Sequence, residues 1–172
     1  IPDMSDYHCA QKEMIGSGSY GKVYKIRNKK DEEFALKYQY IKDNQSSLLL
    51  PSIEKELKIH QELNNHLNTE KEIHIVKCFK SFRQSTTIVN WNLFNSFFPD
   101  FKKNYLIFQI VEYVSGGTLD KDFKKKDKKA DMFIYERIWH LLRGLRYLQK
   151  HNVLHLDIKP ANVRSEEHTS EL

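Results

Sequence analysis

Apolar and polar residues alternate near the start of the chain in a pattern that predicts short strands. Val23 and Ile26 stand among polar neighbours in the run Lys22–Arg27, and Phe34–Lys37 resumes the pattern. A period of two places successive side chains on opposite faces of a sheet. A Gly-rich turn separates the first of these runs from Gln11–Gly16, and the polar stretch 28–32 separates it from the next. The pattern therefore predicts consecutive hairpins.

Two later segments place apolar residues at helical spacing. Pro51 suits an early helical position because the first turn leaves its N–H groups unpaired anyway. Glu54 and Glu56 then fall in the first turns, where carboxylates favour the helix dipole. Asp131 is expected to cap the second helix. The two apolar stripes are Ile53, Leu57, His60 and Leu63, and Ile134, Ile138, Leu141, Leu142, Leu145 and Leu148.

Two further apolar runs, Ile75–Phe82 and Leu106–Val111, have the length of strands. Between them, residues 83–103 form an irregular stretch rich in aromatic side chains and Asn. The predicted order is three strands, a helix, two strands and then helices. This order indicates an α+β fold in which an antiparallel sheet carries one helix and a helical region follows.

Composition narrows the class of protein. The chain has 172 residues, a net charge of +5 and 40% apolar residues, which suits one folded domain with a core. Its two cysteines, Cys9 and Cys78, imply no disulfide framework and predict a reducing, intracellular compartment, cytoplasmic or nuclear. No apolar run approaches the ~20 residues of a membrane span. The Lys-rich segment 121–129 interleaves Asp and lacks base-stacking aromatics, so we expect a solvated surface and no specific nucleic-acid site.

The loop His155–Asn162 carries the clearest chemistry. Asp157 can accept or orient a hydroxyl proton, Lys159 can neutralise a phosphoryl oxygen, and Asn162 can hold a divalent ion. Together they equip a chain for phosphoryl transfer, in which catalysis is mostly positioning and charge stabilisation. No His or Cys spacing resembles a metal site.

The Gly-rich turn Gly16–Gly21 has the pattern G-x-G-x-x-G, which alone describes an ordinary turn, a dinucleotide-binding motif or a phosphate-binding hairpin. A dinucleotide motif opens a helix after its last glycine. Here Gly21 leads into a strand pattern with Val23 two positions on, which favours the hairpin.

In combination, these features resemble eukaryotic protein kinases of the Ser/Thr type. The loop resembles H-R-D-L-x-x-x-N, the turn resembles G-x-G-x-x-G-x-V, and Phe34–Lys37 resembles the strand V-A-I-K. Glu56 follows Lys37 by 19 positions, as does the family's helix carboxylate, and is favoured over Glu54 because it shares a helix side with Ile53.

The resemblance implies ATP and Mg²⁺ as cofactors and a protein hydroxyl as acceptor. The segment 111–117 resembles a kinase hinge, although alone it could equally be a buried strand ending in a Gly-Gly turn. Backbone groups of Glu112 and Val114 would bind adenine, while Val111 would control the back pocket. The implied catalytic residues are Asp157, Lys159 and Asn162, with Asn162 also a metal ligand. For His155 the resemblance implies a structural role, in which it holds the loop. The implied ATP-binding residues are Gly16, Ser17, Gly18, Ser19, Gly21, Val23, Ala35, Lys37, Glu56, Val111, Glu112 and Val114.

The resemblance also implies a kinase-like division of the chain. Residues 1–11 are a lead-in, 12–111 an N-lobe with a five-stranded antiparallel sheet and its αC helix, and 112–117 the hinge. Residues 118–163 begin the helical C-lobe and reach the catalytic loop. Leu156 stands where an Arg usually pairs with an activation-loop phosphate, so we expect that switch to be absent. The catalytic loop resembles Wee-type mitotic inhibitor kinases and some protist kinases, while the Gly-rich loop resembles NimA-related kinases.

The last nine residues, 164–172, are polar and resemble one reading frame of a common short-read sequencing adapter. We therefore expect the native reading to end at Val163, or alternatively a true solvated terminus. No D-F-G Asp or activation loop follows Val163. We expect an inactive fragment of a protein kinase; the alternative is a pseudokinase or nucleotide-binding interaction module. Oligomeric state is not predicted.

Overall fold

The structure is a computed structural model that describes residues 6–8, 13–18, 21–42, 46–67, 74–85, 104–124 and 128–165. The chain divides into two compact units. Unit 1 comprises Ile1–Asn64 and Lys77–Tyr113, and unit 2 comprises Asn65–Val76 and Val114–Leu172. None of the described helices is long and apolar enough to cross a membrane.

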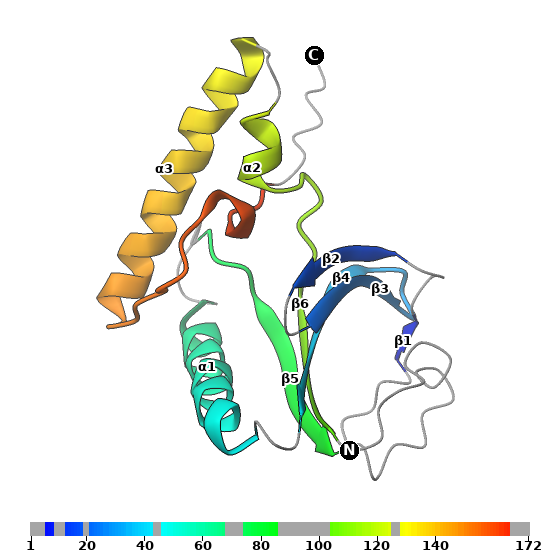
Figure 1. The fold of residues 1–172 in the computed structure, drawn as a ribbon. Helices are drawn as coiled ribbons and strands as arrows, with labels where there is room; N and C mark the ends of the chain where they lie inside the picture. The colour runs from blue at the N-terminus through cyan, green and yellow to red at the C-terminus, as the bar shows by residue number, and fades with distance from the viewer. Residues whose placement is uncertain are drawn as a thin grey trace. The chain divides into compact units, whose positions relative to one another are not determined.

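Unit 1 is built on an antiparallel sheet that confirms the five predicted strands and adds a sixth (Figure 1). Its strand order is β1-β3-β4-β6-β5, with β2 also paired to β3. The extra strand, β1, lies within the predicted lead-in 1–11. The strands are β1 Tyr7–His8, β2 Met14–Gly18, β3 Gly21–Asn28, β4 Glu33–Lys42, β5 Cys78–Ser85 and β6 Asn104–Glu112.

The predicted strand Ile75–Phe82 was displaced from the observed one. Residues 74–77 are not in a strand, and β5 begins at Cys78 and extends to Ser85. The apolar residues Ile75 and Val76 suggested a strand, but β-sheet pairing with β6 begins where Cys78 faces Val111. The stretch 86–103, which includes most of the predicted irregular segment, lies outside the described residues.

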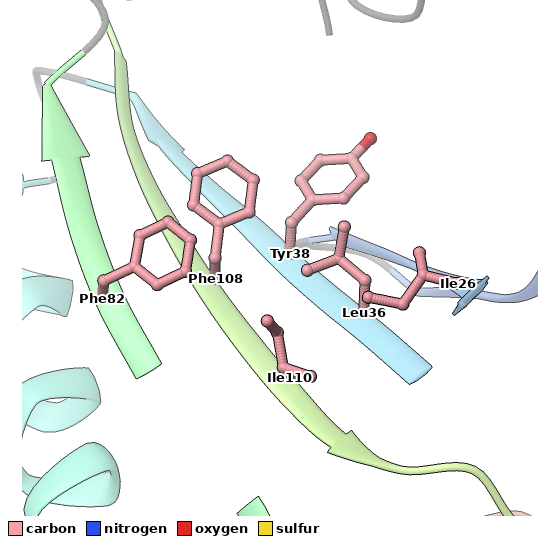
Figure 2. Close-up of a cluster of buried hydrophobic side chains, with 6 residues drawn as sticks. All are labelled: Ile26, Leu36, Tyr38, Phe82, Phe108 and Ile110. Carbon is pink, nitrogen blue, oxygen red and sulfur yellow. The ribbon is translucent and has the colours of Figure 1, made fainter. Parts of the chain in front are cut away.

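One face of the sheet carries the hydrophobic core of unit 1. Tyr38 faces Phe108, which faces Phe82, and Leu36 faces Ile110, so strand register brings these side chains into rows. Figure 2 shows them gathered over β4, β6 and β5. The cluster is Ile26, Leu36, Tyr38, Phe82, Phe108 and Ile110, each at most 8% exposed.

Helix α1, Ser46–Leu67, lies beside β5 (Figure 1). It begins earlier than predicted, so Pro51 lies inside the helix and Glu54 and Glu56 lie beyond its first turn. Glu54 accepts a hydrogen bond from Arg83 on β5, which places α1 against that strand.

Unit 2 contains α2, Leu119–Asp122, and the long helix α3, Lys128–Lys150. Asp131 lies within α3, so the prediction that it caps the helix was wrong; the Lys-rich residues 128–130 join the first turn. Of the predicted stripe, Leu148 is buried and Leu141 and Leu145 are half-buried, while Ile138 and Leu142 are exposed.

Ring stacking and backbone pairing connect segments of unit 2 that are far apart in the sequence. His151 stacks on His66 with ring centroids 4.7 Å apart, and His140 stacks on His74 at 4.0 Å. Arg164 forms an isolated bridge with Thr118, and Ser165 exchanges backbone hydrogen bonds with Gly116 and Gly117. The rest of the predicted non-native tail lies outside the described residues, so its origin stays a prediction.

Candidate functional site

Lys37 and Glu56 form an ion pair in unit 1. Lys37 lies on β4, one position from Leu36, so its side chain points to the opposite sheet face from the core. Its Nζ lies 3.2 Å from Oε1 of Glu56 on α1. Both side chains keep partial exposure, 36% and 41%, so the lysine remains accessible to a ligand. Glu54, the rival carboxylate, pairs with Arg83 instead, as expected from its different helix face.

The Gly-rich segment forms the β2–β3 hairpin. Gly16 faces Val23, Ser17 faces Lys22 and Gly18 faces Gly21. Gly21 is required at its position because a Cβ there would overlap the backbone carbonyl of Tyr38 on β4. The strand that follows Gly21 excludes the dinucleotide motif, which needs a helix at this point. Ser19, predicted to bind ATP, lies outside the described residues.

The end of β6 brings the predicted hinge residues next to β4. Ala35 is buried and pairs with Val111. The Glu112 backbone N–H donates to the Lys77 carbonyl at 2.9 Å, and its carboxylate accepts from the Lys77 N–H at 3.1 Å. The Glu112 N–H is therefore engaged within the sheet, which leaves its carbonyl oxygen as the backbone group for a ligand contact.

Tyr113, the last residue of unit 1, lies under Lys25 of β3, with Nζ 4.5 Å from the ring centroid. Lys25 also pairs with Glu33 at 2.7 Å, which raises its pKa. The contact ties the β3–β4 hairpin to the end of β6 through cation–π attraction.

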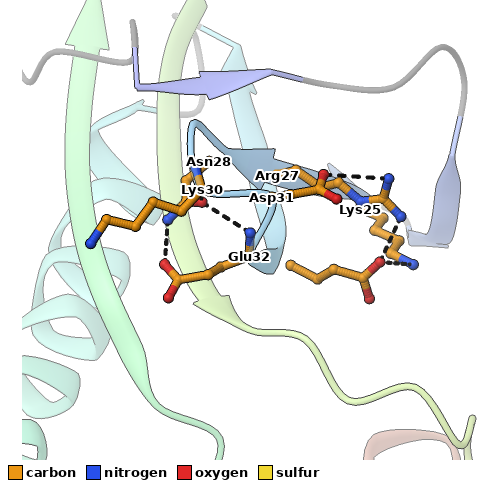
Figure 3. Close-up of polar contacts among 7 residues, drawn as sticks. Lys25, Arg27, Asn28, Lys30, Asp31 and Glu32 are labelled. Carbon is orange, nitrogen blue, oxygen red and sulfur yellow. Dashed lines mark hydrogen bonds and ion pairs between the residues drawn. The ribbon is translucent and has the colours of Figure 1, made fainter.

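Ion pairs and turn hydrogen bonds order the β3–β4 hairpin (Figure 3). Glu33 accepts from both Lys25 and Arg27, and these two cations lower the pKa of its carboxyl group. The Asn28 side-chain oxygen accepts backbone N–H bonds from Lys30 and Glu32 across the turn. The hairpin is thereby fixed at the end remote from the glycines.

The catalytic-loop candidates cluster in unit 2. The Asn162 amide donates to the backbone carbonyl and to Oδ2 of Asp157 at 2.9 and 2.8 Å. Lys159 Nζ lies 3.0 Å from the same Oδ2. The hydrogen bonds from Lys159 and then Asn162 lower the pKa of Asp157, which keeps its carboxylate charged. His155 accepts the Asp157 N–H at 3.3 Å, in keeping with its predicted structural role.

Backbone contacts hold this loop in place. The Leu119 N–H donates to the Val163 carbonyl at 2.9 Å, and Pro160–Asn162 forms a short 3₁₀ helix. Leu156 adopts a positive φ of 61° and is 90% exposed. It contributes neither charge nor buried apolar area at the position that carries Arg in the resembled loop.

The chemistry of these donors fits Mg²⁺ and ATP. Mg²⁺ prefers oxygen ligands, and the Asn162 side-chain amide oxygen can supply one. Triphosphate requires cations and backbone N–H groups, which Lys37 and the glycine hairpin supply. Unit 1 contains the described phosphate and adenine candidates up to Glu112, and unit 2 contains Val114 and the three catalytic candidates.

Sequence reasoning missed a buried amide, Gln109, beside the ion pair. Gln109 is 1% exposed and faces Lys37 across the β4–β6 pair. Its side-chain nitrogen Nε2 lies 3.0 Å from Nδ1 of His60. The signal was visible as one polar residue within the apolar run Leu106–Val111 and one histidine within the apolar stripe of α1.

Comparison with known proteins agrees with this geometry. A family model of the protein kinase domain matches residues 9–170. The chain is 26% identical over 161 residues to a probable cell cycle serine/threonine-protein kinase CDC5 homolog of Encephalitozoon cuniculi, covering 92% of this chain and 29% of that protein. It is 30% identical to the cAMP-dependent protein kinase catalytic subunit of Dictyostelium discoideum, covering 87% and 19%. It is 27% identical to Aurora/IPL1-related protein kinase 2 of Caenorhabditis elegans, covering 87% and 41%. The chain thus spans well under half the length of each relative.

Proposed function

Since the chain belongs to the protein kinase domain family, we propose that it is part of an enzyme that transfers the γ-phosphate of ATP to a Ser or Thr hydroxyl of a protein. The observation that carries the proposal is the Lys37–Glu56 pair at 3.2 Å, formed by residues 19 positions apart on a strand and a helix. A lysine so held is a fixed cation for the α- and β-phosphates. Serine/threonine kinases among the relatives support the choice of acceptor.

Each candidate residue has a role in this proposal. The glycine hairpin covers the phosphates, Glu112 and Val114 bind adenine through backbone groups, and Asn162 holds Mg²⁺. Asp157 orients the acceptor hydroxyl and receives its proton, which suits a carboxylate kept charged by Lys159 and Asn162. Mg²⁺ supplies charge neutralisation of the transferring phosphoryl group when bound.

Finer features belong to the same proposal. The Leu156 side chain cannot pair with a phosphate, so regulation through an activation-loop phosphate is absent. The 172-residue chain binds nucleotide but does not transfer phosphate. The catalytic loop favours a Wee-like subfamily, and the Gly-rich loop favours a NimA-related one. An intracellular location agrees with a chain that has two cysteines.

Nucleotide binding by the chain is the direct test. Displacement of a fluorescent ATP analogue in Mg²⁺ measures the Kd of the wild type, and Lys37→Met is expected to weaken binding at least about tenfold because it removes the phosphate cation. Lys30→Ala is the matched control, since Lys30 is an exposed cation at the β3–β4 turn. Equal affinity for ATP in wild type and Lys37→Met would refute the proposal.

Phosphate transfer requires a second experiment. The gene product extended beyond Val163 is incubated with radiolabelled ATP and a Ser/Thr-containing protein, alongside its Asp157→Asn variant. We expect transfer by the wild type and a loss of about a thousandfold or more in the variant, because the hydroxyl is no longer oriented by a charged carboxylate. Nucleotide binding without transfer by the extended wild type would favour a pseudokinase.

A further inference from the structure

A row of polar residues crosses the face of the sheet that α1 covers. Lys37 of β4 faces Gln109 of β6, and Gln109 faces Ser81 of β5. Paired residues on neighbouring strands point to the same face, so the three side chains line up beneath the helix. Each contacts one α1 residue: the pairs are Lys37–Glu56 at 3.2 Å, Gln109–His60 at 3.0 Å and Ser81–Gln61 at 3.4 Å.

Gln109, at the centre of this polar row, is its buried member. Gln109 is 1% exposed and lies between Phe108 and Ile110, which are 2% and 0% exposed. A buried amide is costly unless it is hydrogen-bonded, and His60 provides a partner. A hydrogen bond is directional, whereas contacts between apolar side chains tolerate sliding. The Gln109–His60 pair therefore specifies where α1 lies along β6.

His60 lies four positions after Glu56, so the two side chains occupy one helix face a single turn apart. The Lys37–Glu56 pair is partly exposed, and such ion pairs contribute little to holding an element in place. We propose that Gln109 and His60 are positioning residues that place the Glu56 carboxylate on Lys37. The inference rests on the proposed function, because it assumes that this pair anchors the phosphates of ATP.

Contacts on either side of Glu56 and His60 along α1 support this assignment without replacing it. Arg83 pairs with Glu54, two residues before Glu56, with side chains 43% and 55% exposed. Near the C-terminal end of α1, the Asn64 side-chain amide donates to the Cys78 carbonyl and accepts from the Cys78 N–H. These contacts restrain α1 along β5, whereas Gln109–His60 lies beside the functional pair on β6.

The first test measures MgATP affinity of the 172-residue chain. Gln109→Leu and His60→Leu are expected to raise the Kd about fivefold to tenfold, since either change removes the hydrogen bond between the two side chains that specifies the helix position. The matched control is Gln61→Leu, the same substitution at an exposed position of the polar row, expected to change the Kd less than about twofold. An effect of Gln61→Leu as large as that of Gln109→Leu would overturn the inference.

A double-mutant cycle shows whether Gln109 acts through Glu56. In a Glu56→Gln background, adding Gln109→Leu is expected to change the Kd less than about twofold, because the carboxylate it positions is already gone. An undiminished fivefold effect in that background would overturn the positioning role.

The thermal unfolding midpoint of each variant distinguishes a role in positioning Glu56 from a role in folding stability alone. The double variant His60→Leu/Gln109→Leu removes both polar groups, so we expect its thermal midpoint to recover relative to the single variants while MgATP binding stays weak. His60→Gln, which retains a hydrogen-bonding amide, is expected to restore most of the affinity. If MgATP affinity simply follows the thermal midpoint in every variant, Gln109 and His60 have a structural role only and the positioning role is rejected.

Failure of this inference is distinguishable from failure of the proposed function. Weak binding by Lys37→Met together with wild-type binding by the Gln109 and His60 variants would reject the positioning role alone. Wild-type binding by Lys37→Met, or none by the wild type, would reject both.

Discussion

Asn162 holds Asp157 at two points, donating to its backbone carbonyl at 2.9 Å and to its carboxylate Oδ2 at 2.8 Å. The two residues are five positions apart, so the intervening loop is closed into a short ring that also brings Lys159 onto the same Oδ2 at 3.0 Å. A carboxylate that accepts hydrogen bonds from a cation and an amide is held in one orientation and in its charged form.

The first prediction concerns the titration of Asp157. Lys159→Met is expected to raise the pKa of Asp157 towards its ordinary value, and Asn162→Ala to raise it by less, because Lys159 is the larger cause of the lowering. Carboxyl-carbon NMR titration of the chain measures both shifts. An unchanged pKa in Lys159→Met would contradict the observed pairing.

The sign of the linked effect on stability follows from the direction of the shift. The pKa of Asp157 is lower in the folded chain than in the unfolded chain. The ionised carboxylate therefore contributes to folding stability at pH values above its unfolded-state pKa, and this contribution is lost as the pH falls through its folded-state pKa. Asn64→Ala is a suitable control because it breaks a helix-to-strand contact in unit 1 and leaves this loop intact.

Local patterns in the sequence were sufficient to predict the sheet, because alternation requires each residue of a strand to face either the core or the opposite side. The Lys37–Glu56 pair was predicted from the resemblance of its 19-position spacing to that of protein kinases, and helix periodicity served only to favour Glu56 over Glu54. Helix starts were predicted less well: Pro51 and Asp131 are both inside helices, because helical extension depends on neighbours that compete with local capping preferences.

The Gln109–His60 contact was beyond prediction for a different reason. Each residue alone looks like an exception in an apolar pattern, and the pairing of the two depends on the register between β4 and β6 and on the rotation of α1. Such long-range geometry is not encoded in the period of a single segment. The two hydrogen bonds from Asn162 to Asp157 could likewise not be predicted from the sequence, since spacing alone does not specify side-chain rotamers.

The second prediction concerns the glycines of the hairpin. Gly21→Ala should destabilise the chain by roughly 1–3 kcal/mol, because the new methyl group meets the backbone carbonyl of Tyr38, which cannot move without disturbing the β3–β4 pair. Gly16→Ala is the matched control: its nearest contact would be Val23 Cβ at 3.6 Å, an ordinary van der Waals distance. Urea unfolding of both variants tests this, and equal midpoints would contradict it.

The third prediction concerns backbone strain at Leu156. Leu156 has φ 61°, a left-handed backbone conformation that is unfavourable in free energy for leucine. Its side chain is 90% exposed, so a replacement loses little buried apolar area. Leu156→Asn should therefore stabilise the chain by about 0.5–1 kcal/mol, since Asn adopts this conformation more readily. Leu154→Asn, an exposed neighbour without a positive φ, is the control. A loss of stability in Leu156→Asn, measured by urea unfolding, would argue against strain at this position.

The fourth prediction concerns the ion pair between Asp122 of α2 and Arg137 of α3. Asp122 is 5% exposed, and burial lowers the pKa of Arg137, so the guanidinium depends on its partner. Asp122→Ala should lower the free energy of unfolding by about 3 kcal/mol because it leaves a desolvated charge unpaired.

The double variant Asp122→Leu/Arg137→Met should recover much of that loss, since neither charge remains. Glu136→Ala, which changes the exposed neighbour of Arg137, is the control. Chemical unfolding followed by a probe in α3, such as Trp139 fluorescence, measures each change. A double variant no more stable than Asp122→Ala would show that the side chains' packing, not their charge pairing, holds α2 on α3.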